Sequence, residues 1–288
     1  YGPIHSNGGI RFDGIAYNII SSAVANYNDP DHSGSNEFGV HTHVSPVDPL
    51  PPATVPNRPD VFVAGREFPV PAIDFDGISA DLSQIKTAAQ ASGKYFGSSG
   101  DKGYEMILKT NDTFDVYKVK SIKSVPNNCP DDDDDDWGTW SVNNTTFVGN
   151  YPIPANGLVF FEDHVWVRGQ INTARITVAA ARFPESTSTR KSITLNSDLL
   201  YTNYDGQDVI GLISQNDVNV GLYSEDDLRI DGALIAKAGR VGRPYYKANT
   251  SQTYCGTEAK RATITLYGMI ATNERYGFSW SCGGVYCS

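Results

Sequence analysis

The stretch GPIHSNGGIRF, residues 2–12, and the stretch GMIATNERYGF, residues 268–278, carry the same pattern near opposite ends of the chain. In both, Gly is followed by an aliphatic residue, Asn, an apolar residue and Phe at the same offsets. A third copy, GLVFFEDHVWV, begins at Gly157, and weaker copies begin at Gly211 and Ala233. The aliphatic position holds Ile4, Val159, Ile213, Ile235 and Ile270. Short apolar runs broken by a turn-forming residue are typical of strand–turn–strand units.

Repetition of such a unit predicts the rungs of a coiled sheet. We therefore expect a mainly β fold: a β-solenoid-like (right-handed β-helix-like) or rolled β core with a small α+β insertion. An ordinary β-sandwich needs similar strands and turns and is the alternative. We expect one continuous domain. Its parts are a first β rung with a Pro-rich surface loop over 1–75, a helix and hairpin over 76–125, an acidic loop over 126–155, and the main core over 156–288.

The insertion contains two well-marked local elements. SADLSQIKTAAQASG predicts a helix with Ser79 as its N-cap and Gly93 at its end. The apolar stripe of this helix is formed by Ile78, Leu82, Ile85 and Ala89. GYEMILKTNDTFDVYKVKSI then predicts a β-hairpin, because two alternating runs flank Asn111 and Asp112.

Composition narrows the classes of function. Only 19% of the 288 residues are charged, and the net charge is −10. Nucleic-acid binding is disfavoured, because it needs clustered Lys and Arg to replace phosphate counterions. No apolar run is long enough to span a bilayer. Since the chain begins with Tyr1 rather than Met, we expect a longer precursor whose preceding segment holds any membrane anchor or export signal.

Four cysteines are consistent with two disulfides in an oxidising compartment, with three possible connectivities, although free thiols are the alternative. They are Cys129, Cys255, Cys282 and Cys287. Their spacing does not match a zinc knuckle.

Six consecutive aspartates, residues 131–136, form the most conspicuous charged run. Alternate side chains of an extended segment point the same way, so Asp131, Asp133 and Asp135 could converge on a calcium ion. The run lacks the spaced ligands, the turn glycine and the distal Glu of a calcium loop. A solvated acidic loop is therefore the competing interpretation. We expect no cofactor other than this calcium.

Other polar motifs give weaker signals for chemistry. His41 and His43 could present two imidazoles on one strand face, but no carboxylate follows three or four residues later, so the pattern disfavours a metal site. Carboxylates that could serve glycoside cleavage occur at no informative spacing; they are Asp13, Asp74, Asp76, Asp226, Asp227, Asp231 and Glu274. GRVGRPYY, residues 239–246, is interpreted as a turn whose arginines stack on tyrosines or pair with acidic groups, with a carbohydrate or partner contact as the alternative.

Seven segments in order resemble one family. They are GPIHSNGGIRFDG, FPVPAIDFDGISADLSQIKTAAQ, TFDVYKV, NGLVFFEDHVWVRGQINTARITVAAA, LLYTNYDGQDVIGLISQNDVNV, DLRIDGALIAKAGRVGRPYY and ITLYGMIATNERYGFSW. Together they resemble the PilX-like, minor-pilin-related secreted surface proteins of candidate-phylum (Patescibacteria-type) bacteria. The resemblance implies a prepilin-like hydrophobic helix ahead of this region and a pilus-associated role. It supplies no catalytic residues.

From these observations we expect a non-enzymatic extracellular module of a pilus-like or cell-surface assembly, with a structural or adhesive role. Its expected partners are other pilin-like or surface subunits, including copies of itself, and a host-surface or glycan ligand. We expect membrane contact only through a segment outside this sequence. The alternatives are a β-helix carbohydrate-active enzyme and a calcium-stabilised subunit that polymerises through its end rungs.

Overall fold

The computed structural model describes residues 2–29, 36–126, 129, 138–246, 255–275, 277–278, 281–282 and 285–286. The chain divides into two compact units, Tyr1–Asp74 and Phe75–Ser288. Each unit is described by itself. Within the described ranges, no helix combines the length and the apolar character needed to cross a membrane.

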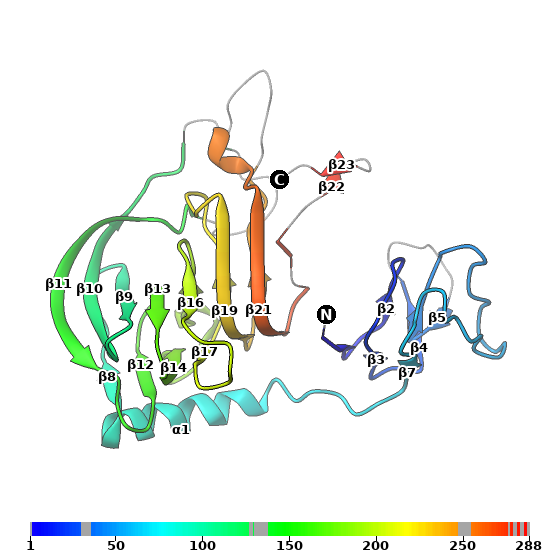
Figure 1. Ribbon diagram of the computed structural model, residues 1–288, viewed down its shortest axis with the longest axis horizontal. Helices are drawn as coiled ribbons and strands as arrows, with labels where there is room; N and C mark the ends of the chain where they lie inside the picture. Colours follow the sequence, from blue (N-terminus) through cyan, green and yellow to red (C-terminus); the bar gives the residue numbers. More distant parts are fainter. Residues whose placement is uncertain are drawn as a thin grey trace. The chain divides into compact units, whose positions relative to one another are not determined.

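The N-terminal unit is built from short strands (Figure 1). They are β1 (Ile4–Ser6), β2 (Ile10–Arg11), β3 (Ile20–Ser22), β4 (Asn26–Asn28), β5 (Asn36–Phe38), β6 (Val40–His41) and β7 (Arg66–Glu67). β1, β3 and β7 pair in parallel, as do β2 and β6, whereas β4 and β5 form an antiparallel hairpin. Ala16 forms a parallel bridge with Phe62. The chain therefore visits the same three positions twice, first through β1, β2 and Ala16 and then through β3, β6 and Phe62.

The C-terminal unit contains helix α1 (Gly77–Ser92) and a 14-stranded sheet. The strands of the sheet are β8 (Lys94–Phe96), β9 (Gly103–Lys109), β10 (Thr113–Ile122), β11 (Val142–Pro152), β12 (Leu158–Phe161), β13 (Val165–Ile171), β14 (Arg175–Ala180), β15 (Ile193–Thr194), β16 (Leu199–Tyr201), β17 (Val209–Ser214), β18 (Val218–Asn219), β19 (Asp227–Ala236), β20 (Val241–Gly242) and β21 (Thr263–Thr272). The short elements η1 (Thr187–Thr189), η2 (Thr257–Ala259), β22 (Ser281–Cys282) and β23 (Val285–Tyr286) lie outside this sheet.

Most of the sheet consists of parallel stacks. One stack runs through β8, β12, β14, β17, β19 and β21. A second runs through β13, β15, β18 and β20, and a third joins β13 to β16 and β19. From β12 onward, successive strands alternate between stacks, so the chain returns to the same stack one circuit later. The expectation of a mainly β fold is confirmed, with a large and mainly parallel sheet.

The five repeated segments form the strand–turn–strand units that the pattern predicts. They correspond to β1–β2, β12–β13, β17–β18, β19–β20, and β21 followed by the bridge of Gly277 to Gly242. The register corrects the alignment at two copies, because Leu212 and Leu234, not Ile213 and Ile235, lie in line with Ile270. Where two aliphatic residues are adjacent, the sequence pattern does not decide which of them is the aligned one. In a strand their side chains point to opposite faces, so a shift of one residue changes which side chain is buried.

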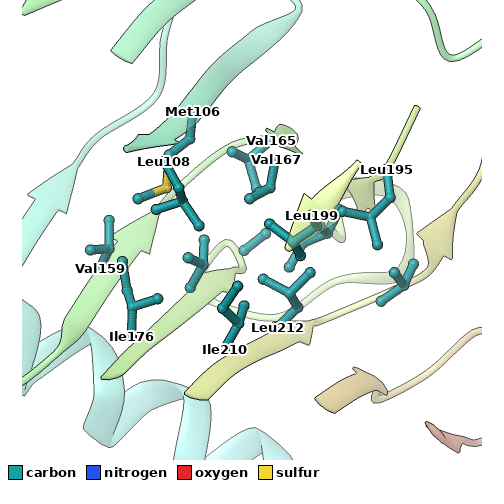
Figure 2. Packing of buried hydrophobic residues seen from close by; sticks show 14 of the residues in the cluster. Met106, Leu108, Val159, Val165, Val167, Ile176, Leu195, Leu199, Ile210 and Leu212 are labelled. Atoms are coloured by element: carbon teal, nitrogen blue, oxygen red, sulfur yellow. The ribbon is translucent and has the colours of Figure 1, made fainter. Parts of the chain in front are cut away.

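Aliphatic side chains from the stacked strands meet in one interior (Figure 2). Those labelled in the close-up are Met106, Leu108, Val159, Val165, Val167, Ile176, Leu195, Leu199, Ile210 and Leu212. On the outer face of the first stack, α1 packs over a second apolar cluster that contains Phe160 and Ala179. Strands β12 and β14 are thus buried on both faces, as their runs without strict alternation predict.

The predicted helix and hairpin both form, with corrections. Helix α1 ends at Gly93 as expected, but its N-cap is Asp76 rather than Ser79, because the helix starts far enough upstream for Ile78 to pack in the apolar cluster. The hairpin β9–β10 is not a separate insertion, since β9 pairs in parallel with β13 and so belongs to the main sheet. The segment expected as an acidic loop contains a long strand, β11, which pairs with β10.

Gly268 provides a test of this register. It pairs with Gly232, its φ is +149°, and a Cβ added to it would lie 2.0 Å from the carbonyl oxygen of Gly232. We expect Gly268→Ala to lower the free energy of unfolding by about 2 kcal/mol or more, through strain and displaced backbone. Gly277→Ala is the matched control, because a Cβ there meets nothing within 4 Å. Urea unfolding of both variants measures the difference, and equal stabilities would contradict the register.

Candidate functional site

Three side chains of the N-terminal unit converge in a group that we call the histidine–carboxylate cluster: Glu37, His41 and His43. Glu37 comes from β5, His41 from β6, and His43 lies two residues beyond His41. One ligand atom from each residue lies within 4.8 Å of the others. The cluster arises because the chain turns sharply between β5 and β6, and because alternate residues of extended chain point to the same side.

The cluster is tightly packed and largely removed from solvent. The distance is 2.8 Å from His41 Nε2 to Glu37 Oε2, and 2.6 Å from His43 Nε2 to Glu37 Oε1. The side chain of His41 is 1% exposed, that of Glu37 7% and that of His43 12%. Asp29, just after β4, lies close by, with Oδ2 3.9 Å from His41 Nε2 and a side chain 8% exposed. Two imidazoles and two carboxylates therefore share one buried volume.

The backbone that carries the histidines is fixed by two carboxylate acceptors, Asp13 and Asp48. The N–H of His43 donates to Asp13 at 2.8 Å, and the N–H of Thr42 donates to Asp48 at 3.3 Å. Burial opposes ionisation of Asp13, but its hydrogen bonds to the His43 N–H and to Arg11 outweigh burial and lower its pKa. Asp48 also pairs with the buried guanidinium groups of Arg58 and Arg66. These contacts hold the backbone of Thr42 and His43, and with it the two histidines, in place.

The sequence disfavours a metal site at His41 and His43, because no carboxylate follows them three or four residues later. The structure corrects the basis of that judgement, since the carboxylates precede the histidines: Glu37 lies four residues before His41, and the antiparallel pairing of β4 with β5 returns Asp29 to the same place. A search upstream would have found Glu37. Asp29 carries no local signal in the sequence, because it depends on the hairpin.

Other predicted site residues have different outcomes. Asp131, Asp133 and Asp135 lie outside the described residues, as does Cys287, and the side chain of Cys282 is not described. Calcium binding by the acidic run stays a prediction. Cys129 and Cys255 form a disulfide that closes a sequence separation of 126 residues.

The carboxylates considered for glycoside cleavage do not gather in one place. Asp13 belongs to the N-terminal unit, whereas the acidic side chains of DDLRIDG belong to β19 and its approach in the C-terminal unit. Asp231 is fully buried, accepts hydrogen bonds from Tyr204 Oη and the Tyr201 N–H, and pairs with Arg229. Asp226 accepts from the N–H of Ala262. These two carboxylates hold strands and turns together. Asp74, Asp76, Asp227 and Glu274 are exposed.

The arginine and tyrosine residues of GRVGRPYY act in the interior. Arg243 lies 4.6 Å from the ring centroid of Tyr246 and donates to the carbonyls of Ala259 and Glu258. Burial lowers the pKa of Arg243 to about 10 and raises the pKa of Tyr246. Tyr246 packs beside the Cys129–Cys255 disulfide. The stacking prediction is therefore confirmed, and these two side chains are not a surface for a ligand.

A small cavity of about 180 Å³ opens between β9, β13 and the turns that follow β15 and β18. Its lining includes Trp166, Tyr223 and Lys123. Glu105, the lining carboxylate, pairs with Arg168 at 2.9 Å. A second carboxylate, which the usual glycosidase mechanism requires, is not among the lining residues that the structure describes.

The last strand of the first stack has a different character. β21 pairs with β19 over ten residues without a register shift, and within the described chain it has no partner on its other side. Its sequence, TITLYGMIAT, has no charged residue and no proline. Tyr267 and Met269 are each 50% exposed. Natural edge strands are usually short, charged or bulged, because an open strand edge invites pairing with another chain. β11, an edge strand elsewhere in this sheet, is bulged and polar.

Comparison with known protein families, with curated proteins and with solved structures finds no match for this chain.

His164 is a partly buried support in the C-terminal unit. Its Nδ1 accepts a hydrogen bond from the N–H of Ser192, and burial, aided by Lys191, lowers its pKa to about 4. In the unfolded chain the imidazole of His164 is protonated near its ordinary pKa of 6.5, whereas in the folded chain it stays neutral down to about pH 4. The stabilisation is therefore complete above pH 6.5 and is lost as the pH falls from 6.5 towards 4.

We expect this group alone to remove about 2–3 kcal/mol of stability across that window. His164→Asn keeps an acceptor near the position of Nδ1 but does not titrate, so it should flatten the pH dependence by that amount. Urea unfolding of both proteins from pH 4 to 8 measures the difference. Parallel curves would show that His164 is not held neutral by the fold.

Proposed function

We propose that this chain is a non-enzymatic structural subunit of an extracellular, pilus-like or cell-surface assembly, with its main sheet wound as a β-solenoid that grows by strand addition at β21. The open edge of β21 carries the proposal. A ten-residue strand without charge, bulge or proline is suited to receive another strand through its backbone groups.

The solenoid interpretation is supported by how the chain moves between stacks. Circuits run from β12 to β13, from β14 through β15 to β16, and from β17 through β18 to the first half of β19. The second half of β19 then pairs with β17 and begins the next circuit towards β20. Such a stack can be extended one circuit at a time, because each circuit contacts only its neighbours.

The two ends of the stack differ in how they can be extended. Before the first circuit, β9 is covered by the antiparallel pair β10 and β11, and β11 contains register shifts. Solenoids need such atypical capping elements to remain soluble. β21 follows the last full circuit and has no equivalent cover among the described residues. Because only the β21 end of the described chain is open to pairing, we expect each chain to bind one partner there, either as a dimer or as an end-to-side contact with another surface subunit.

The backbone direction shows which groups are available for pairing. Thr263 and Asn273 donate their N–H groups to the carbonyls of Asp226 and Ala236 on the β19 side. The odd-numbered residues of β21 therefore bond to β19, and the even-numbered residues direct their N–H and C=O groups to the open edge. Beside this edge, Tyr267 packs edge-on against Tyr204, so an exposed aromatic surface accompanies the backbone groups.

The resemblance to PilX-like, minor-pilin-related surface proteins supports the same role. Pilus and surface subunits act through assembly rather than through bond chemistry. The resemblance covers GALIAKAGRVGRPYY and ITLYGMIAT, the segments that form β19 to β21. The proposed partner is therefore another copy of this chain or a related subunit that offers an extended strand.

The proposal predicts concentration-dependent association. We expect sedimentation and native mass measurements to show dimers or larger species, and Thr265→Glu with Met269→Glu to shift association to about tenfold higher concentration, because carboxylates meet across the paired edges. The double variant should keep its unfolding midpoint, since both side chains are exposed.

Thr146→Glu with Val148→Glu on β11 is the matched control, because it adds the same charge at two exposed positions of another edge. It should associate as the parent chain does. A parent chain that stays monomeric at millimolar concentration, or two variants that associate equally, would overturn assembly through β21.

A further inference from the structure

We propose that the histidine–carboxylate cluster, with Asp29 beside it, binds one zinc ion that ties the hairpin β4–β5 to strand β6. The site lies within the N-terminal unit and does not depend on the assembly role proposed for β21.

The tautomer of His41 provides the first argument. Its Nδ1 lies 2.9 Å from the carbonyl oxygen of Phe38. A carbonyl oxygen only accepts, so Nδ1 carries a proton and donates it. In neutral His41 the lone pair is therefore on Nε2, which is the arrangement of metal-binding histidines whose second nitrogen bonds to a backbone carbonyl.

The surroundings of Nε2 provide the second argument. This atom is buried, and among the described residues it has no partner in hydrogen-bond geometry, although Glu37 Oε2 is only 2.8 Å away. A lone pair facing a carboxylate oxygen at this distance is repulsive unless a cation lies between them. A proton on Nε2 would not resolve the contact well, because the two atoms are close but poorly aligned for a hydrogen bond. An ion to which both atoms point would resolve it.

Charge balance provides the third argument. The carboxylates of Asp29 and Glu37 bring two negative charges into a volume whose side chains are at most 12% exposed. With neutral imidazoles, the four side chains carry a net charge of −2. One divalent cation at the cluster would match this charge.

The donor set selects zinc. Two imidazole nitrogens and two carboxylate oxygens suit a borderline ion, whereas calcium and magnesium prefer all-oxygen sites. Donors around tetrahedral zinc are separated by about 3.4 Å, given bonds of about 2.1 Å. The Nε2 atoms of His41 and His43 lie 2.8 and 2.6 Å from oxygens of Glu37, and one ligand atom of each residue lies within 4.8 Å of the others, so small shifts would reach that separation. Glu37, His41 and His43 supply the three donors that converge, and Asp29, with Oδ2 3.9 Å from His41 Nε2, lies next to them outside that group.

The alternative is a cluster without a metal ion, in which both imidazoles are protonated and pair with the carboxylates. The two states differ in their response to zinc. At pH 7.5 a zinc site takes up one equivalent and releases it as acid protonates the imidazoles. A proton-only cluster takes up none.

Native mass spectrometry of the full chain, stripped with chelator and titrated with zinc chloride at pH 7.5, tests the proposal. We expect one zinc ion per chain and a melting temperature raised by several degrees. His41→Gln with His43→Gln should weaken zinc binding by roughly 100-fold or more. His5→Gln is the matched control, because this histidine of the same unit bonds to Ser21 and Asn7 and should leave zinc binding unchanged.

Two further measurements keep the test decisive. The triple variant Asp131→Asn, Asp133→Asn and Asp135→Asn should still bind one zinc ion per chain. Loss of zinc binding in this variant would assign the ion to the acidic run and overturn the proposed site. If the histidine double variant fails to fold, cobalt(II) replaces it as the probe. Strong visible absorption from the wild-type chain supports a tetrahedral nitrogen-containing site, whereas only the weak absorption of octahedral cobalt contradicts it. Absence of any bound zinc also overturns the proposal and leaves the association through β21 unaffected.

Discussion

The alignment of aliphatic side chains from one strand to the next in the parallel stacks is the constraint on which the C-terminal unit depends. Strands of two to six residues bury too little surface to persist alone, but stacked in parallel they share one continuous interior. In the first stack the inward positions are Val159, Val178, Leu212, Leu234 and Ile270. A slip of one residue would turn each of these side chains outward, so burial fixes the register.

This stacking requires tight bends, and buried polar side chains stabilise them. Parallel strands are usually joined by a crossover helix, but here several connections are only short turns whose backbone N–H groups need acceptors. Asp208 accepts from the N–H groups of Ala174, Thr202 and Asn203, and so links neighbouring circuits. Asp217 does the same for Arg240, and its burial raises its pKa. Part of the acidic excess of the chain therefore serves the architecture rather than a ligand.

The sequence predicts features that depend on local pattern. Spacing identified the repeated units, the helix stripe and the hairpin at Asn111, because each is encoded within about twenty residues. It failed where distant pairing decides the outcome. β11 was missed because its polar residues face solvent on a sheet edge, and Asp29 was missed because only the hairpin brings it near His41. The register at Leu212 was missed because Ile213 is equally apolar, and only the apolar cluster beneath α1 explains why Ile213 faces outward.

Both units pair short strands in parallel, but they differ in what stabilises them. The C-terminal unit has a large aliphatic interior, a helix over one face and a disulfide. The N-terminal unit, Tyr1–Asp74, has an apolar cluster of five buried residues among those described, and domains of this size often need additional cross-links. Its buried polar groups are correspondingly concentrated: Asp48 joins Arg58 and Arg66 in one network, and Glu37 joins both histidines in another. Removing one partner from such a network leaves a buried charge exposed to a low dielectric. The small unit therefore relies on polar centres for the cohesion that stacked aliphatic residues supply in the large one.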